Sequence, residues 1–239
     1  MRLTVHSSLL LKEEVKMKYQ NSRKLQNATA DLKFLLNKDY NKKAALDFVG
    51  NHYLLDKDER NYLQRKVYST QKSKGRKSKI IPLSKIKGKK LLIDGYNVLI
   101  TVESICSSDN SIVVCDDGIL RDVNAVFGKY RCKDETRDAL NSIVALVKIY
   151  HPADVEFFFD SQVSKSGELA QLAGKILIEH GVEGNARTEP NVDYQLVKES
   201  GETGGVVASS DSVIMDQVEY ILDIPCFIHK IKKKNLSLF

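Results

Sequence analysis

The 239-residue sequence lacks several features that would place it in a specialised class. No apolar run approaches the roughly 20 residues of a membrane-spanning helix, and the first residues hold too short an apolar stretch for a secretory signal. The four cysteines stand singly, without a C-x-x-C pair, so neither a zinc site nor a disulfide framework is indicated. We therefore expect a cytoplasmic protein with reduced, buried thiols and no membrane association.

Basic residues are in excess. The chain carries 37 Lys and Arg against 31 Asp and Glu, which gives a net charge of +6 and suggests a polyanionic partner, although surface lysines also keep ordinary proteins in solution. A segment without any acid runs from Gln71 to Lys90. Because Gly, Ser and Pro interrupt its periodicity, we interpret residues 71–87 as a basic linker, either a solvated tether or an RNA-binding one. Its candidate nucleic-acid contacts are Lys72, Lys74, Arg76, Lys77 and Lys79.

Residues 1–70 have a helical pattern. Apolar residues between Leu32 and Val49 recur at helical spacing, and Asp56 with Glu59 has the spacing of a capping box at the start of a further helix. No catalytic spacing occurs in this part of the chain. We expect a smaller all-α N-terminal domain, which could serve a protein partner or a homodimer.

Residues 88–239 alternate between apolar strands and amphipathic helices. Two helices are expected between strands, one ending before Pro152 and one stopping at Gly181. Right-handed crossovers of this kind predict an α/β fold with a mainly parallel sheet. The stretch 111–131 interrupts the pattern and is interpreted as an inserted hairpin or lid.

Four carboxylates follow the strands of this expected sheet. Asp94 ends LLID, Asp160 ends FFFD, Asp193 follows NART and EPNV, and Asp211 follows VVASS. Because parallel strands end at the same edge of a sheet, we expect these acids to gather there, where a hard divalent cation would relieve their repulsion. Asn97 is placed to orient a ligand or a neighbouring acid. A site of this kind suits phosphodiester chemistry.

Each of these acids also has a structural explanation. Asp94 precedes Gly95 and could be a turn residue, and Asp193 at the start of a helix could be favoured by the helix dipole. Asp117 and Asp122 are ambiguous, because they could complete the site or cap the insertion, and Asp216 is a weaker candidate than Asp211, which comes first after the strand. Of these, Asp117 and Asp216 are kept as additional candidate metal ligands.

The motifs LLIDGYNVL, FFFDS, NVDYQLV and VVASSD resemble, in order and spacing, those of PIN-like nucleases, and DGYN looks most like the NYN branch. The helical block before them is similar to that of an uncharacterised archaeal family which joins it to a PIN-like domain. The resemblance covers residues 88–230 and implies a PIN-like, Rossmann-type sheet flanked by helices and a ribonuclease that uses Mg²⁺ or Mn²⁺. The resemblance also implies roles for five residues of this chain: the metal ligands would be Asp94, Asp160, Asp193 and Asp211, and Asn97 would be a supporting catalytic residue. An obvious acid in the helix after the first strand is lacking, and Asp117 is the candidate substitute.

Two other functions fit parts of the sequence. A non-catalytic RNA-binding or scaffolding protein could keep a PIN-like fold without metal chemistry. A phosphatase of the haloacid dehalogenase type also ends its first strand in aspartate, but it needs a second aspartate two positions later, where this chain has Tyr96. Metal binding separates the ribonuclease from the scaffold.

Overall fold

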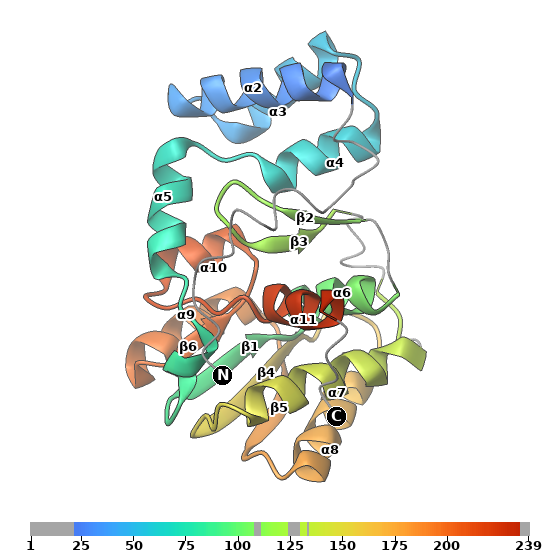
Figure 1. Ribbon diagram of the computed structural model, residues 1–239, viewed down its shortest axis with the longest axis vertical. Coiled ribbons are helices and arrows are strands. Elements are labelled where there is room, and N and C mark those ends of the chain that lie inside the picture. Colours follow the sequence, from blue (N-terminus) through green and yellow to red (C-terminus); the bar gives the residue numbers. More distant parts are fainter. Residues whose placement is uncertain (1–21, 108–110, 124–129, 133, 235–239) are drawn as a thin grey trace. The chain divides into compact units, whose positions relative to one another are not determined.

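The computed structural model describes residues 22–107, 111–123, 130–132 and 134–234 and divides the chain into two compact units. Unit 1 comprises residues 1–78 and 109–125, and unit 2 comprises residues 79–108 and 126–239 (Figure 1). Residues 1–21 of the expected N-terminal domain lie outside the described ranges. Unit 1 is therefore built from two separate stretches of the chain.

Four helices make up most of the described part of unit 1: α2 (Arg23–Asn37), α3 (Lys42–His52), α4 (Lys57–Lys66) and α5 (Thr70–Lys79). The expected capping box is confirmed at the start of α4, where the Asp56 carboxylate accepts from the Glu59 amide and the Glu59 carboxylate accepts from the Asp56 amide. Leu32 and Leu63 are completely buried in the core of this unit. The helical pattern of the N-terminal part was thus predicted correctly.

Unit 1 is not all-α. The antiparallel strands β2 (Ile112–Val114) and β3 (Leu120–Asp122) form a hairpin that belongs to this unit, although the chain around it belongs to unit 2. Val113, Cys115 and Val123 are buried in the same core as the helices. The amide of Asp116 also donates to the carbonyl of Lys66 at the end of α4. The inserted hairpin was expected, and its packing completes the helical core.

The basic segment does not form an irregular linker. Residues up to Lys79 form α5, whose two buried side chains, Ser73 and Arg76, lie one turn apart on one face. The chain then enters unit 2, where Ile80 pairs with Ile221 in a parallel bridge and Leu83–Ile86 form a 3-10 helix, η1. Gly75 and the serines were read as breaks, but the buried face of α5 outweighs their low helix propensity.

Unit 2 contains a parallel sheet of four strands: β1 (Lys90–Asp94), β4 (Asp154–Asp160), β5 (Gly184–Glu189) and β6 (Val206–Ala208). The strand order is β5-β4-β1-β6. The predicted α/β class with a mainly parallel sheet is therefore confirmed. From β1 the chain adds β4 and then β5 on one side, and it returns to place β6 on the other side of β1. The order reverses between β1 and β6, which is the position where open α/β sheets bind ligands.

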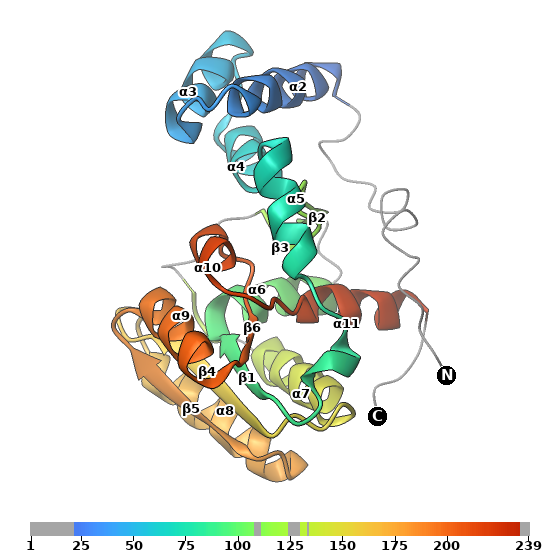
Figure 2. The same cartoon turned by 90° about the vertical axis from the view of Figure 1, so that its left-hand side faces the viewer.

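Among the residues that the structure describes, six helices surround this sheet: α6 (Gly95–Cys106), α7 (Asp134–Lys148), α8 (Ser166–His180), α9 (Val192–Thr203), α10 (Ser212–Gln217) and α11 (Ile224–Lys233). α8 packs on β4 and β5, whereas α9 packs on β1, β4 and β6 (Figure 2). Because the crossover through α9 runs back across the sheet, right-handed connections place it on the face opposite α8. No helix within the described ranges is long and apolar enough to cross a bilayer.

Two other expectations concerned the end of α8 at Gly181 and the burial of the cysteine thiols. Gly181 ends α8 in the left-handed conformation, with φ of 62°, as its position in the sequence predicted. All four cysteines are free thiols. Cys115 is buried, but Cys132 is exposed, so the expectation of uniformly buried thiols was wrong.

Candidate functional site

The end of β1 meets the segment after β6 at the point where the strand order reverses. Asp94 is the last residue of β1 and is only 3% exposed. Its Oδ2 accepts hydrogen bonds from Asn97 Nδ2 at 2.5 Å and from Ser209 Oγ at 2.7 Å. The carboxylate also caps α6, because the Asn97 amide lies 3.4 Å from Oδ1. The side chain of Asp94 is thus held in one orientation by two neighbouring segments.

Gly95 is required directly after this aspartate. A Cβ atom at this position would lie 2.3 Å from the Phe159 ring and 2.8 Å from the Phe158 carbonyl oxygen in the adjacent strand β4. Only glycine permits the approach of the α6 N-terminus to β4. The Asp-Gly pair therefore places the carboxylate at the sheet edge and lets the following helix start at once.

The environment of Asp94 favours its protonated form. Burial is the main cause, and the charge of Asp211 adds to it, whereas the hydrogen bonds from Ser209 and Asn97 act in the opposite direction. Together they raise the pKa of Asp94 to about 7. A cation at this position would favour the carboxylate form.

Asp211 follows β6 and begins the short helix α10. Its Oδ1 accepts from the amides of Val213 at 2.6 Å and Ile214 at 3.3 Å. Its own amide donates to Ser209 Oγ at 3.0 Å. Ser209 therefore bridges Asp94 and Asp211, donating to the carboxylate of the first and accepting from the backbone of the second.

Two further acids, Asp160 and Asp193, lie after other strands of the same sheet. Asp160 ends β4, and its Oδ1 accepts from the Gln162 amide at 2.8 Å. Asp193 lies exposed in the first turn of α9, after the N-cap Asn191. Its pKa is raised, first by partial burial and then by the charges of Asp211 and Asp160. We call Asp94, Asp160, Asp193 and Asp211 the acidic edge.

The chemistry of the acidic edge fits a hard divalent cation, but the spacing of its carboxylates does not enclose one. In the ranges that the structure describes, no three His, Cys, Asp or Glu side chains are grouped closely enough to hold a metal ion. Mg²⁺, however, commonly binds proteins through one or two carboxylates and keeps several waters. The all-oxygen donor set and the mutual repulsion of the acids therefore remain compatible with such a cation.

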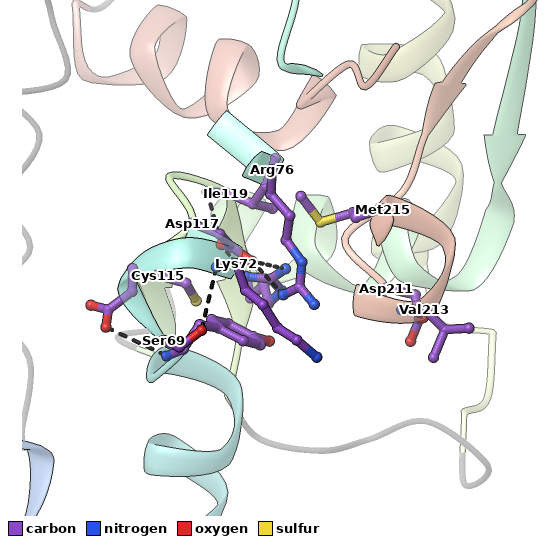
Figure 3. A network of polar contacts seen from close by, with 12 residues as sticks. Ser69, Lys72, Arg76, Cys115, Asp117, Ile119, Asp211, Val213 and Met215 are labelled. Carbon is purple, nitrogen blue, oxygen red and sulfur yellow. Dashed lines mark hydrogen bonds and ion pairs between the residues drawn. The ribbon is translucent and has the colours of Figure 1, made fainter. Parts of the chain in front are cut away.

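Asp117 and Asp122 do not contribute to the acidic edge. Both oxygens of Asp117 are bound by guanidinium groups within unit 1, at 2.7 and 2.8 Å from Arg121 and at 3.1 Å from Arg76 (Figure 3). Asp122, also in the hairpin, accepts from Ser111 Oγ at 2.6 Å. Asp117 is thus a structural ion-pair partner, which argues against the proposed role as a substitute metal ligand.

Two other acids, Asp216 and Glu103, differ from what was expected of them. Asp216 is exposed near the end of α10, more than one turn beyond Asp211. The helix after β1 does contain an acid, Glu103, which was overlooked. Its Oε1 accepts from the hydroxyls of Tyr130 at 2.5 Å and Thr136 at 2.6 Å, so it serves to join α6 to the start of α7.

The five basic residues proposed to contact RNA fall into two groups. Lys72, Lys74 and Lys77 are exposed on α5. Arg76 is 3% exposed and paired with Asp117, and Lys79 Nζ donates to the carbonyl oxygens of Met215 and Asp216 in unit 2. Arg76 and Lys79 thus have structural partners, which argues against their role as RNA contacts and leaves the three exposed lysines as the candidates.

Ser209 is the site residue that the sequence reasoning missed. It is 4% exposed and connects two of the four acids. The available signal was its position two residues before Asp211 in VVASSD. Tyr96, which stands where a phosphatase would need its second aspartate, is buried in edge-to-face contact with Tyr130 and Phe159.

Comparisons with known proteins divide the chain near residue 80, and the C-terminal match includes the hairpin that packs in unit 1. The family described as "Domain of unknown function (DUF5616)" matches residues 83–226, and the family described as "Protein of unknown function (DUF434)" matches residues 24–79. An uncharacterized protein of Methanocaldococcus jannaschii is 38% identical over 213 residues, which cover 88% of this chain and 99% of the relative. No solved structure matches the chain significantly. The chain therefore belongs to the DUF5616 family, with a DUF434 segment preceding that domain.

Proposed function

We propose that unit 2 is a PIN-like ribonuclease domain that hydrolyses RNA phosphodiester bonds with the help of Mg²⁺ or Mn²⁺ bound at the acidic edge. The observation that carries the proposal is the position of Asp94 and Asp211, joined by Ser209, where the strand order reverses. The topology of an open α/β sheet makes this the preferred ligand position. The resemblance of the surrounding motifs to PIN-like nucleases supports the same conclusion.

The side chains of the acidic edge have different roles in this proposal. Asp94 and Asp211 would hold the cation, and Asp160 and Asp193 would hold a second one or orient its waters. A bound cation supplies charge neutralisation for the phosphodiester and an activated water. Asn97 and Ser209 keep Asp94 oriented through their hydrogen bonds, which spares the site the cost of ordering this carboxylate when the cation binds.

One specific observation favours the non-catalytic alternative. The described part of the chain contains no preformed group of three acids for a metal ion. An RNA-binding or scaffolding protein would need none. The two functions differ in whether the acidic edge binds Mn²⁺ and whether RNA is cut.

The deciding experiment is Mn²⁺ titration by calorimetry together with cleavage of a labelled single-stranded RNA, on the wild type and two variants of β4. Asp160→Asn changes the acidic edge, whereas Asp154→Asn changes the other end of the same strand, where Asp154 is 3.6 Å from Lys90. We expect the first to weaken Mn²⁺ binding and slow cleavage about tenfold or more and the second to leave both unchanged. RNA binding without Mn²⁺ binding or cleavage in the wild type would establish the scaffold instead.

A further inference from the structure

Two apolar side chains are exposed beside the acidic edge of unit 2. Tyr194 directly follows Asp193 in the first turn of α9 and is 61% exposed. Val213 stands two residues after Asp211 in the first turn of α10 and is 54% exposed. Because α9 and α10 pack against each other, accessible apolar surface lies next to acids at two neighbouring helix starts.

The start of α9 lies close to the acids that follow β4 and β6. Burial and the charges of Asp211 and Asp160 raise the pKa of Asp193, so both acids are within electrostatic reach of this turn. The Oδ1 atom of Asn191 accepts from the amide of Tyr194 at 3.2 Å and fixes the backbone at this position. Tyr194 thus has a defined place at the edge where the cation is proposed to bind.

The ring of Tyr194 faces solvent rather than the sheet. Leu196 and Ser200 are the buried residues of α9, and Tyr194 lies on the opposite side of the helix, about 160° around the axis from Leu196. Helical side chains lean toward the start of their helix, so the ring leans toward the acidic edge. Among the described residues, no aromatic ring and no cation is stacked on it. A planar group can therefore use this surface.

A lysine accompanies the ring. Lys198 lies one turn after Tyr194 on the same exposed face of α9. Within the described ranges its ammonium group has no ion-pair partner. Its long side chain also leans toward the helix start and adds a positive charge beside the ring. Proteins that bind single-stranded nucleic acids combine these two groups, since the ring stacks on a base and the cation attracts the phosphates.

We propose that Tyr194 stacks on an unpaired base of an RNA whose phosphodiester lies at the acidic edge, and that Lys198 contacts the RNA backbone. This inference rests on the proposed function and narrows its substrate to single-stranded RNA. A base inside a duplex is paired and stacked between its neighbours, so it reaches a protein ring only after it is flipped out. Every base has a face that can stack, so we expect little sequence preference from this contact.

A protein partner fits this surface less well. Charged residues are depleted from the cores of protein interfaces, whereas Asp193 and Asp211 stand beside the two apolar side chains. Each partner in a standard interface also buries about 800 Å². One aromatic side chain buries about 150 to 250 Å². The exposed apolar surface at this edge therefore suits one or two bases.

The test measures RNA binding by the full-length protein through fluorescence anisotropy, without divalent cations so that no strand is cut. The probes are a labelled single-stranded RNA, the same strand paired with its complement, and a strand of equal length with abasic positions. We expect Tyr194→Ala to weaken binding of the single strand about tenfold and to change binding of the other two probes less than about twofold. Tyr194→Phe keeps the ring and should keep the wild-type affinity. Tyr40→Ala, at a 59% exposed tyrosine of unit 1, is the matched control and should have no effect.

Lys198→Gln provides a second readout. It should lower the slope of log affinity against log salt by about 0.7 for the single strand, because one phosphate contact is lost. The preference for the single strand over the abasic strand should remain, because Tyr194 is intact. Thermal unfolding checks that every variant folds.

Cleavage of the single strand in Mn²⁺ separates this inference from the proposed function. Binding that depends on Tyr194 without cleavage would uphold the stacking contact and refute the ribonuclease. Cleavage by the wild type, with equal binding by Tyr194→Ala, would do the reverse. The stacking contact would also be overturned if the wild type bound no single-stranded RNA or if Tyr194→Ala weakened all three probes equally. Loss of self-association in Tyr194→Ala with unchanged RNA affinity would assign the ring to a protein contact instead.

Discussion

The hydroxyl of Ser209 donates a hydrogen bond to the carboxylate of Asp94 across 2.7 Å, although the two residues are 115 positions apart in the sequence. The contact exists because β6 is the parallel neighbour of β1. It opposes the effect of burial on the pKa of Asp94. Ser209 is therefore a positioning residue for the acidic edge.

Ser209→Ala should raise the pKa of Asp94 further, because a hydrogen bond to its charged form is lost. We expect Mn²⁺ binding to weaken about tenfold and its pH midpoint to move upward, with the fold retained. Calorimetry over a pH series measures both. Ser161→Ala, at an exposed position after β4, is the control and should resemble the wild type.

Asp94→Asn should change how stability depends on pH. Folding raises the pKa of Asp94 from its ordinary 3.8 to about 7, so between these values the folded state holds a proton that the unfolded state has lost. Stability therefore falls as pH rises through this window. The neutral asparagine removes this loss, and without metal the variant should be about 1 to 4 kcal/mol more stable relative to wild type above pH 7 than at pH 4.

Urea denaturation at several pH values checks this prediction. Asp154→Asn should keep the wild-type pH dependence of stability, because the ion pair between Asp154 and Lys90 is partly exposed to solvent. A parallel shift of stability at every pH would show that Asp94 is charged in the folded protein.

Asp117→Asn should destabilise unit 1 by about 3 to 5 kcal/mol, because it leaves two buried guanidinium groups without their carboxylate. Asp116 is the matched control. It pairs with Lys33, whose side chain is 39% exposed, so Asp116→Asn should cost about 1 kcal/mol or less. Urea denaturation and hydrogen exchange in residues 23–66 compare the two variants. Equal losses would mean that the Asp117 ion pairs are not the main contact of the hairpin.

Replacing Lys72, Lys74 and Lys77 by serine should weaken RNA binding. Each lost phosphate contact lowers the slope of log affinity against log salt by about 0.7, so the full set should lower it by about 2. Stability should hardly change, because all three side chains are exposed. An unchanged slope in a salt titration would place the RNA contacts elsewhere.

The inserted hairpin affects how unit 2 can be isolated. A fragment that starts at Ile86 loses the pairing of Ile80 with Ile221, and it retains the hairpin without the core that buries Val113 and Val123. We expect a fragment from Lys79 in which residues 109–125 are replaced by a short flexible loop to be monomeric and folded. The unmodified fragment from Ile86 should aggregate. Size-exclusion chromatography and circular dichroism distinguish these outcomes.

The sequence predicted the parts of the fold that depend on local pattern. The apolar faces of α7 and α8, the stop at Gly181 and the capping box of α4 are all set by neighbouring residues. The four acids were placed by the general rule that parallel strands end at one edge. These features need no knowledge of which strands are neighbours.

The parts that were missed depend on contacts between distant residues. Arg76 was taken for an RNA contact because its pairing with Asp117, 41 residues later, has no local signal. Ser209 was overlooked for the same reason, since its role requires β6 to lie beside β1. Charge and spacing alone cannot separate a buried ion pair from a solvated basic surface.

The discontinuity of unit 1 has a consequence for synthesis of the protein on the ribosome. The four helices leave the ribosome before the hairpin that shares their core, and Arg76 precedes its partner Asp117 by 41 residues. At about 5 to 20 residues per second, this interval lasts roughly 2 to 8 seconds. During that time part of the apolar core lacks its cover. The nascent helices are therefore expected to be a binding site for chaperones until the first strand of unit 2 and the hairpin behind it have emerged.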